Sequence, residues 1–136
     1  MISFQSEDVS FRLKERKKLK SWIVEVISTE MKRAGDVCFI FVSDQYLLEM
    51  NLKYLKHDTL TDVITFDYSE GDVVSGDIFI SVQRVKENAA TFAVNFNEEL
   101  HRVMIHGVLH LIGFGDKSKT ESDVMRGKED FYLARL

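Results

Sequence analysis

The chain has 136 residues, of which 45% are hydrophobic and 29% are charged, and its net charge of −4 argues against a basic protein that coats nucleic acid. The single cysteine, Cys38, excludes an intrachain disulfide and a cysteine-rich metal site, so a metal would have to be held by histidine and carboxylate. We expect one domain, residues 1–136, in the cytoplasm, because no signal peptide begins the chain and no apolar run approaches the ~20 residues that span a membrane.

Residues 2–6 are expected to form a weak edge strand, and residues 12–33 are expected to form a helix that Gly35 ends. Apolar side chains recur in this helix at spacings of three and four residues, which places one stripe against a core. The stripe consists of Leu19, Trp22, Ile23, Val26, Ile27 and Met31. The lysines and arginines of residues 12–20 form either a solvated helix face or a patch that contacts phosphates.

Residues 36–43 are apolar, β-branched and aromatic, which predicts a buried strand. A helix is expected over residues 44–55, with Ser43 or Asp44 as its N-cap. The short, turn-rich connection between the next two strands predicts that they pair in an antiparallel manner. These strands are residues 61–68 and 76–81.

Three helices are expected in the rest of the chain, at residues 83–92, 98–112 and 119–136. Asn95 precedes Glu98 by three residues, which is the spacing of a helix N-cap and its partner. The helix over residues 98–112 is apolar on nearly all sides, and we therefore expect it to be buried. The order of elements predicts an α+β fold. In this fold a small mixed sheet of three to four strands is covered by helices, and a central buried helix carries two histidines.

His106 and His110 lie four residues apart in that helix and therefore on the same face. Gly113 is expected to end the helix, so that the chain turns back and supplies Asp116 as a third ligand. We predict that these side chains bind one zinc ion and leave a fourth position for water, whose pKa falls to ~7. The pattern indicates a hydrolase whose one identifiable catalytic group is the metal-bound water. The alternative is that both histidines are structural residues of the core.

Gly107 follows the first histidine, at the position where metallopeptidases of this spacing carry the glutamate that acts as general base. A peptidase is therefore disfavoured. A glycine inside a helix costs ~1 kcal/mol relative to alanine, and close packing of another backbone against the helix would explain it. His101 lies five residues before His106, so we expect its side chain to point away from the metal.

The sequence His-Gly-Val-Leu-His-Leu-Ile-Gly-Phe at residues 106–114 resembles the signature of the YbeY family. Further stretches resemble that family in the expected order: residues 51–54, 61–66 and 76–78, Met125 and Glu129. The resemblance implies a bacterial zinc-dependent endoribonuclease that acts in rRNA maturation and ribosome quality control. It also implies single-stranded RNA as the substrate and the small ribosomal subunit as a partner.

Two positions depart from the family pattern. Asp116 stands where the family has a histidine as third ligand, and an alternative alignment places Lys117 there, although a charged lysine is a poor ligand. Leu55 stands where the family usually has arginine, which removes one expected phosphate contact. Three nearby residues are candidates for binding the substrate instead: Lys53, Lys56 and His57.

Two alternative functions remain beside the endoribonuclease. One is a metallopeptidase or another metal-dependent hydrolase, which Gly107 disfavours. The other is a ribosome-assembly factor that binds RNA and whose metal is mainly structural. A metal site that is open to a cleft favours the nuclease, whereas a fourth protein ligand favours the structural role.

Overall fold

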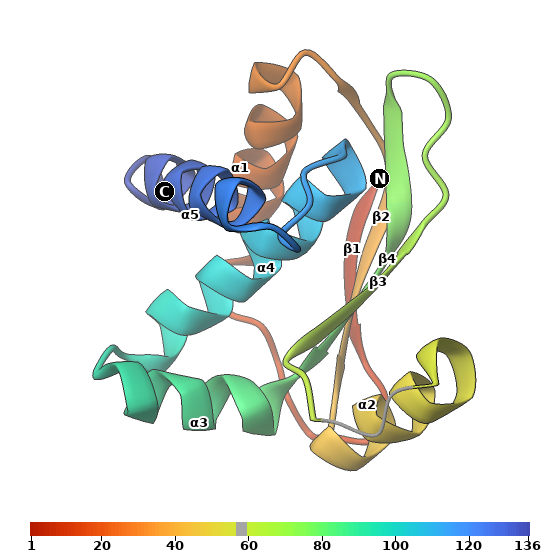
Figure 1. Cartoon of the computed structure of the whole chain (residues 1–136), viewed down its shortest axis with the longest axis vertical. Coiled ribbons are helices and arrows are strands. Elements are labelled where there is room, and N and C mark those ends of the chain that lie inside the picture. The colour runs from red at the N-terminus through yellow and green to blue at the C-terminus, as the bar shows by residue number, and fades with distance from the viewer. Residues whose placement is uncertain (57–59) are drawn as a thin grey trace.

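The computed structural model describes residues 1–56 and 60–136. These residues form an α+β fold whose elements follow the predicted order (Figure 1). The elements are β1 (Ile2–Ser6), α1 (Arg16–Thr29), β2 (Arg33–Val42), α2 (Asp44–Met50), the π-helical turn η1 (Asn51–Leu55), β3 (Val63–Asp67), β4 (Val73–Ser81), α3 (Val82–Phe92), α4 (Phe96–Ile112) and α5 (Lys119–Leu133). No helix in the described part of the chain is both long enough and apolar enough to cross a membrane.

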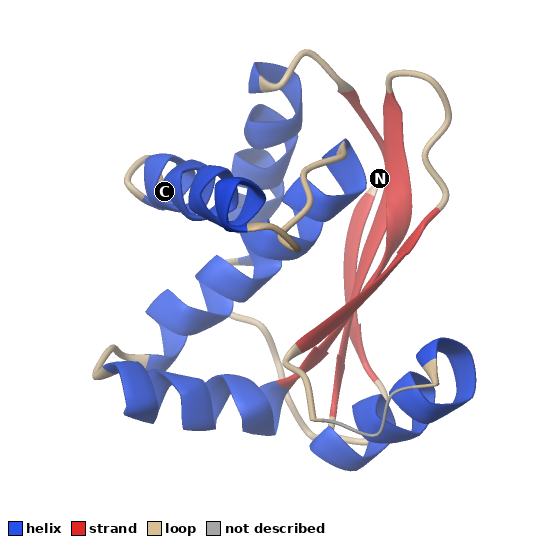
Figure 2. Cartoon of the chain, in the orientation of Figure 1, coloured by secondary structure: helices blue, strands red, loops and turns tan. Residues whose placement is uncertain are grey.

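The four described strands form one mixed sheet in the order β1-β2-β4-β3 (Figure 2). The pairs β1–β2 and β2–β4 are parallel, whereas β3 and β4 are antiparallel. Both predictions about strand position are confirmed: β1 lies at an edge, and the two strands joined by the short turn pair in an antiparallel manner. The parallel strands are linked through helices, as such crossovers require.

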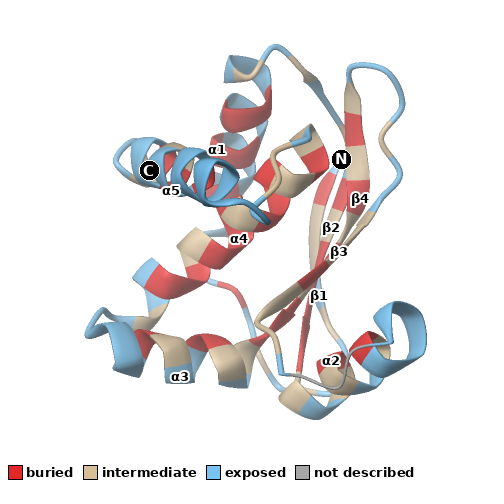
Figure 3. Cartoon of the chain, in the orientation of Figure 1, coloured by how far each residue is buried: buried red, intermediate tan, exposed pale blue. Residues whose placement is uncertain are grey.

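Alternate residues of β2 point to opposite faces of the sheet, and each face packs against helices. Val37 and Phe39 belong to the larger core, which α1, α4 and α5 cover together with the sheet. Ile40 and Val42 belong to a smaller core with Leu47 of α2 on the opposite face. The buried residues of α1 and α4 accordingly face the sheet, whereas those of α5 face α4 and α1 (Figure 3). The continuous apolar run of β2 is explained by this burial on both faces.

The first helix is shorter than predicted. It begins at Arg16 instead of residue 12 and ends at Thr29 instead of near Gly35, which lies within β2. The reversal occurs at Met31, whose φ of 64° is left-handed and whose side chain is 86% exposed. The prediction that Met31 belongs to the buried stripe was therefore wrong. The prediction that Trp22 faces the core is confirmed, because its side chain is buried and its Nε1–H donates to the carbonyl of Tyr132.

Helix α4 begins as the spacing of Asn95 and Glu98 predicts. The Asn95 side chain accepts a hydrogen bond from the backbone N–H of Glu98 at 2.8 Å, and its amide donates to the Glu98 carboxylate. Most of the helix is buried between the sheet and α5. The capped start and the buried body together fix the axis on which the two histidines are carried.

Gly107 lies where α4 packs against β4, and a side chain there would have no room. A Cβ atom at this position would lie 2.8 Å from Cγ2 of Ile78. The close neighbour is thus a side chain of the sheet, and the expectation that it would be another backbone was wrong. Because Cγ2 is attached directly to the β-carbon of a stiff β-branched residue, it cannot easily move aside.

Replacing Gly107 with alanine (G107A) is therefore expected to lower the free energy of unfolding. Overpacking typically costs ~1–3 kcal/mol, and the better helix propensity of alanine returns ~1 kcal/mol. We expect a net loss of about 1 kcal/mol in urea unfolding. The matched control is G127A in α5, where nothing lies within 4 Å of the new Cβ. G127A should be neutral or stabilising, and an equal loss in both variants would contradict the packing explanation.

Candidate metal centre and its adjacent cavities

Three side chains converge where α4 ends. His106 and His110 project from the same face of α4, one turn apart. Gly113 ends the helix with a φ of 125°, a conformation that side chains other than glycine rarely adopt. The chain then turns back past Phe114 and brings Asp116 to the two histidines. The arrangement matches the one predicted from the spacing of these residues.

The distances within the cluster fit a metal ion. The Nε2 atoms of His106 and His110 lie 3.0 Å apart. Oδ2 of Asp116 lies 3.2 Å from the first of these nitrogens and 3.3 Å from the second. In a tetrahedral zinc site with bonds of ~2.0–2.1 Å, the ligand atoms lie ~3.3–3.4 Å from one another. The three atoms are therefore spaced like ligands of one small cation.

The hydrogen bonds of the two imidazoles also fit a metal. Nδ1 of His106 lies 2.7 Å from Oε2 of Glu129, and Nδ1 of His110 lies 2.9 Å from the carbonyl oxygen of Phe114. A carbonyl and an ionised carboxylate only accept, so each Nδ1 carries a proton, and each ring, when neutral, presents a lone pair at Nε2. Two lone pairs and the carboxylate oxygen of Asp116 then face one another, which is unfavourable without a cation between them.

Glu129 of α5 is the outer partner that orients His106. Its side chain is almost fully buried, and its second oxygen accepts from Nη1 of Arg102 at 3.0 Å. Nη2 of Arg102 donates to Asp130 at 2.8 Å, so the guanidinium is held by two carboxylates. Burial lowers the pKa of His106, but the hydrogen bond and charge of Glu129, with Asp116 and Asp62, outweigh it and raise that pKa above its ordinary value.

This role of Glu129 was missed in the sequence, where the residue was noted only as a match to the family pattern. A local signal did exist. Met125, Glu129 and Tyr132 are the buried residues of α5, and they lie at spacings of four and three. A glutamate within an otherwise apolar helical stripe indicates a buried carboxylate that requires a partner.

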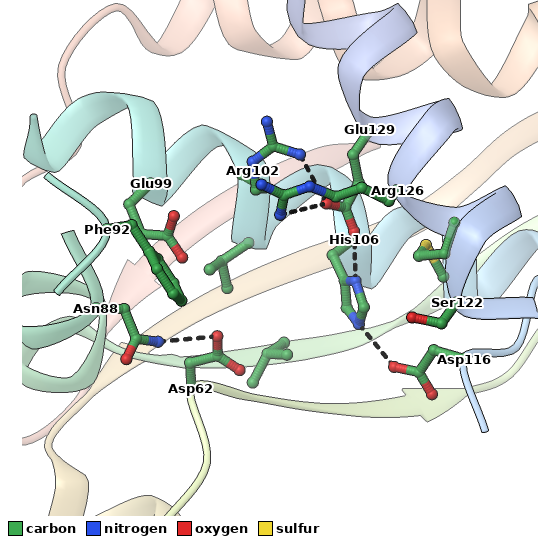
Figure 4. A pocket seen from close by; sticks show the side chains of 13 residues that line it. Asp62, Asn88, Phe92, Glu99, Arg102, His106, Asp116, Ser122, Arg126 and Glu129 are labelled. Atoms are coloured by element: carbon green, nitrogen blue, oxygen red, sulfur yellow. Dashed lines mark hydrogen bonds and ion pairs between the residues drawn. The ribbon is translucent and has the colours of Figure 1, made fainter. Parts of the chain in front are cut away.

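Two cavities meet at the cluster, and His106 and Asp116 line both. Figure 4 shows the first of them. The first, of about 370 Å³, extends from the cluster along α4 towards Glu99 and Phe92. The second, of about 540 Å³, extends towards η1 and includes Leu55 and Lys117. The Asp116 side chain is 41% exposed. The candidate metal centre is therefore accessible to a ligand from two sides.

Two carboxyl groups in the first cavity have raised pKa values. Burial raises the pKa of Asp62, whose Oδ2 accepts from the Asn88 amide at 3.3 Å. Burial and the nearby charge of Asp62 raise the pKa of Glu99, which is only 6% exposed. The folded state therefore holds a proton on Glu99 more tightly than the unfolded state does.

This shift predicts a pH-dependent effect of replacing Glu99 with glutamine (E99Q). Above the raised pKa of Glu99 in the folded state, its ionisation lowers the free energy of unfolding. Below the pKa of glutamate in the unfolded chain, ~4.3, this loss of stability is absent. We expect E99Q to increase the free energy of unfolding by about 0.5–2 kcal/mol at pH 7. Thermal unfolding with a chelator present should show the gain vanish towards pH 4. The control E25Q changes an exposed glutamate of α1 and should have little effect, and a pH-independent gain in E99Q would contradict this explanation.

Two other predicted site residues, Lys53 and Lys56, lie away from the cluster. Lys53 and Lys56 are exposed on and after η1, and neither lines the two cavities. His57 lies outside the described residues. Lys117, which the sequence offers only as an alternative ligand, lines the second cavity beside Leu55. His101 contacts the edge of the Trp22 ring, as expected for a side chain that points elsewhere.

Comparison with known proteins places these features in a family. The family model for Endoribonuclease YbeY matches residues 1–136. A protein from Flavobacterium psychrophilum with that name is 55% identical over 130 residues, which cover 96% of this chain and 92% of the relative. Another from Phocaeicola vulgatus is 48% identical over 136 residues, which cover 100% and 99% of the two chains.

A solved structure agrees with the sequence comparison. The solution structure of a Thermotoga maritima protein superposes with a TM-score of 0.66 at 34% identity, and the match covers 98% of this chain and 87% of that one. The family model matches all 136 residues, and the identity of the relatives and the shared fold agree with that match. The chain belongs to the YbeY family.

Proposed function

We propose that this chain is a metal-dependent endoribonuclease that cleaves single-stranded RNA in rRNA maturation, in association with the small ribosomal subunit. Membership of the family and the name of its relatives support cleavage within RNA chains. The observation that carries the proposal is the cluster of three ligand atoms at the meeting point of two open cavities. Among the described residues no fourth histidine, cysteine or carboxylate joins this cluster.

His106, His110 and Asp116 hold one zinc ion in this proposal. Two imidazole nitrogens and one carboxylate oxygen form a donor set that zinc accepts in hydrolases, where three protein ligands leave one position open. When bound, zinc would supply Lewis-acid polarisation of a phosphoryl oxygen and would lower the pKa of water to ~7. An aspartate in place of a neutral histidine adds a negative charge, which makes the bound ion a weaker Lewis acid.

The chain's own residues prepare the site and the substrate. Glu129 holds the proton of His106 at Nδ1 and so keeps Nε2 free for the metal. Lys117 lines the second cavity and supplies a cation near the position where Leu55 replaces the family's arginine. The exposed lysines Lys53 and Lys56 bind phosphates of the RNA beyond that cavity.

The alternatives are weaker on this geometry. A structural metal is normally enclosed by four protein ligands, whereas this cluster offers three and opens to two cavities. A peptidase of this histidine spacing uses a glutamate directly after the first histidine. Here that position is Gly107, which is packed against Ile78 and has no room for a side chain.

Replacement of Asp116 tests the ligand assignment. In D116A one of three ligands is lost, and we expect zinc affinity to fall by more than ~100-fold. Loss of a residue that only hydrogen-bonds to a ligand typically costs ~10–100-fold. In D116H the donor is restored at the same spacing, so zinc binding and RNA cleavage should persist. Competition with a chromophoric chelator measures the affinity, and an unstructured RNA measures cleavage.

The matched control is D123A, which removes an exposed aspartate that pairs with Lys119 on α5. It should leave both quantities unchanged. Unchanged zinc affinity in D116A would show that Asp116 is not a ligand. Loss of zinc in D116A with full retention of cleavage would overturn the proposed metal-dependent function.

A further inference from the structure

The cavity along α4 carries a feature that metal binding does not explain. Glu99 and His106 lie on the same face of α4, seven residues and therefore ~10 Å apart along the helix axis. Both line the cavity of about 370 Å³, which also includes Asp116. An RNA whose phosphate lies at the metal centre can thus place the base of the same or the adjacent nucleotide at Glu99.

The Glu99 carboxylate points into this cavity without a hydrogen-bonding partner (Figure 4). The side chain is only 6% exposed, and no described residue donates a hydrogen bond to it or forms an ion pair with it. Arg102 lines the same cavity, but Glu129 and Asp130 engage its guanidinium. The Glu99 oxygens are reachable from the cavity, and a ligand that brings N–H donors would supply hydrogen bonds that the described residues do not give them.

The remaining walls of the cavity suit a flat aromatic ligand. Phe92, the last residue of α3, is 60% exposed and lines the cavity next to Glu99. Val63, Val103 and Met125 add apolar wall area. Arg126 lines the same cavity with its side chain 64% exposed; its Nη1 lies 3.8 Å from Oε1 of Glu129, and it can also meet a phosphate. An exposed aromatic ring beside a polar acceptor is a typical surface for an unstacked RNA base.

A second metal site does not account for this cavity. Its carboxylates include Asp62 and Glu99, yet among the described residues the only group of three close ligand atoms is the cluster of His106, His110 and Asp116. Asp62 is moreover engaged by the Asn88 amide. Glu99 lies beside the exposed Phe92 ring in this cavity, and one carboxylate with an aromatic neighbour fits a base better than an ion.

We propose that this cavity binds a guanine base adjacent to the scissile phosphate, with the Glu99 carboxylate accepting its N1–H and N2 amino donors. This inference rests on the proposed endoribonuclease function. Guanine is the one standard base whose Watson–Crick edge presents two neighbouring donors to the two oxygens of a carboxylate. Adenine and cytosine place an acceptor nitrogen beside their single amino group, and uracil has one N–H between two carbonyls. Each would leave one oxygen of Glu99 unpaired or repelled.

The test uses short unstructured RNAs that differ at one central position, which is guanosine, inosine, adenosine or cytidine. With the zinc-loaded protein, cleavage next to guanosine should be about 10- to 100-fold faster than next to adenosine or cytidine. Inosine lacks the N2 amino group and should lie in between. In E99Q the ratio of guanosine to adenosine should fall to within about threefold, because an amide offers one acceptor where guanine needs two.

Two further variants separate base recognition from general effects. E98Q makes the same change at the adjacent exposed residue, which does not line this cavity, and it should keep the full guanosine preference. F92A removes the stacking surface and should weaken binding of all four RNAs roughly tenfold without changing the ratio. Fluorescence anisotropy with metal-free protein measures the same base preference without cleavage.

The outcomes distinguish the base pocket from the proposed function. If the wild type cleaves all four RNAs at equal rates, or E99Q keeps the guanosine preference, the guanine pocket is wrong and the endoribonuclease stands. If the zinc-loaded wild type cleaves none of them, the proposed function fails. In that case anisotropy still decides the pocket, since equal affinity for the guanosine and adenosine RNAs would overturn it.

Discussion

Replacing His110 with alanine (H110A) is expected to abolish both zinc binding and RNA cleavage while the fold is retained. His110 supplies one of three converging ligand atoms, and two ligands cannot hold the ion in the same geometry. We expect zinc affinity and the cleavage rate each to fall by more than ~100-fold, because even the loss of an outer partner costs ~10–100-fold. Zinc content, thermal unfolding and cleavage of an unstructured RNA are measured on the same preparation.

The matched control for H110A is H101A, a histidine on the same helix that contacts Trp22 instead of the cluster. H101A should retain zinc and cleavage, even if the loss of that contact lowers its melting temperature. Cleavage that persists in H110A at the wild-type rate would point to a contaminating nuclease. It would leave the metal centre without a catalytic role.

Replacing Glu129 with glutamine (E129Q) is expected to produce the second largest effect. The amide oxygen can still accept from Nδ1 of His106, but the negative charge that makes the imidazole a stronger ligand is lost. We expect zinc affinity to fall ~10–100-fold, with RNA cleavage at limiting zinc falling in parallel. Arg102 keeps its ion pair with Asp130, so the variant should remain folded.

The control for E129Q is D130N. Asp130 contacts the same arginine at 2.8 Å but does not touch His106. If Glu129 acts through the imidazole, D130N should change zinc affinity less than about twofold. Equal losses of zinc affinity in E129Q and D130N would indicate instead that the two carboxylates act by holding Arg102 in place.

The candidate metal cluster could be predicted from the sequence because its geometry is local. His106, His110 and Asp116 lie within eleven consecutive residues, and helical periodicity followed by the turn at Gly113 determines how they meet. Helix α4 was predictable for the same reason, from its apolar periodicity and the Asn95 cap.

Features that depend on contacts distant in sequence could not be predicted. Glu129 lies 23 residues after His106, and only the docking of α5 on α4 brings them together. The cavity that contains Glu99 is formed by residues of β3, α3, α4 and α5, so no local pattern contains it. The end of α1 depends on a left-handed Met31, a residue whose type gives no signal for that conformation.

A zinc titration of the metal-free protein tests the central claim most directly. Cleavage of an unstructured RNA is followed as zinc is added to a known concentration of chain. If His106, His110 and Asp116 form one catalytic metal site, cleavage should rise in proportion to zinc and level off at one ion per chain. Cleavage at full rate in the metal-free protein, or saturation of zinc binding without any cleavage, would contradict the proposed function.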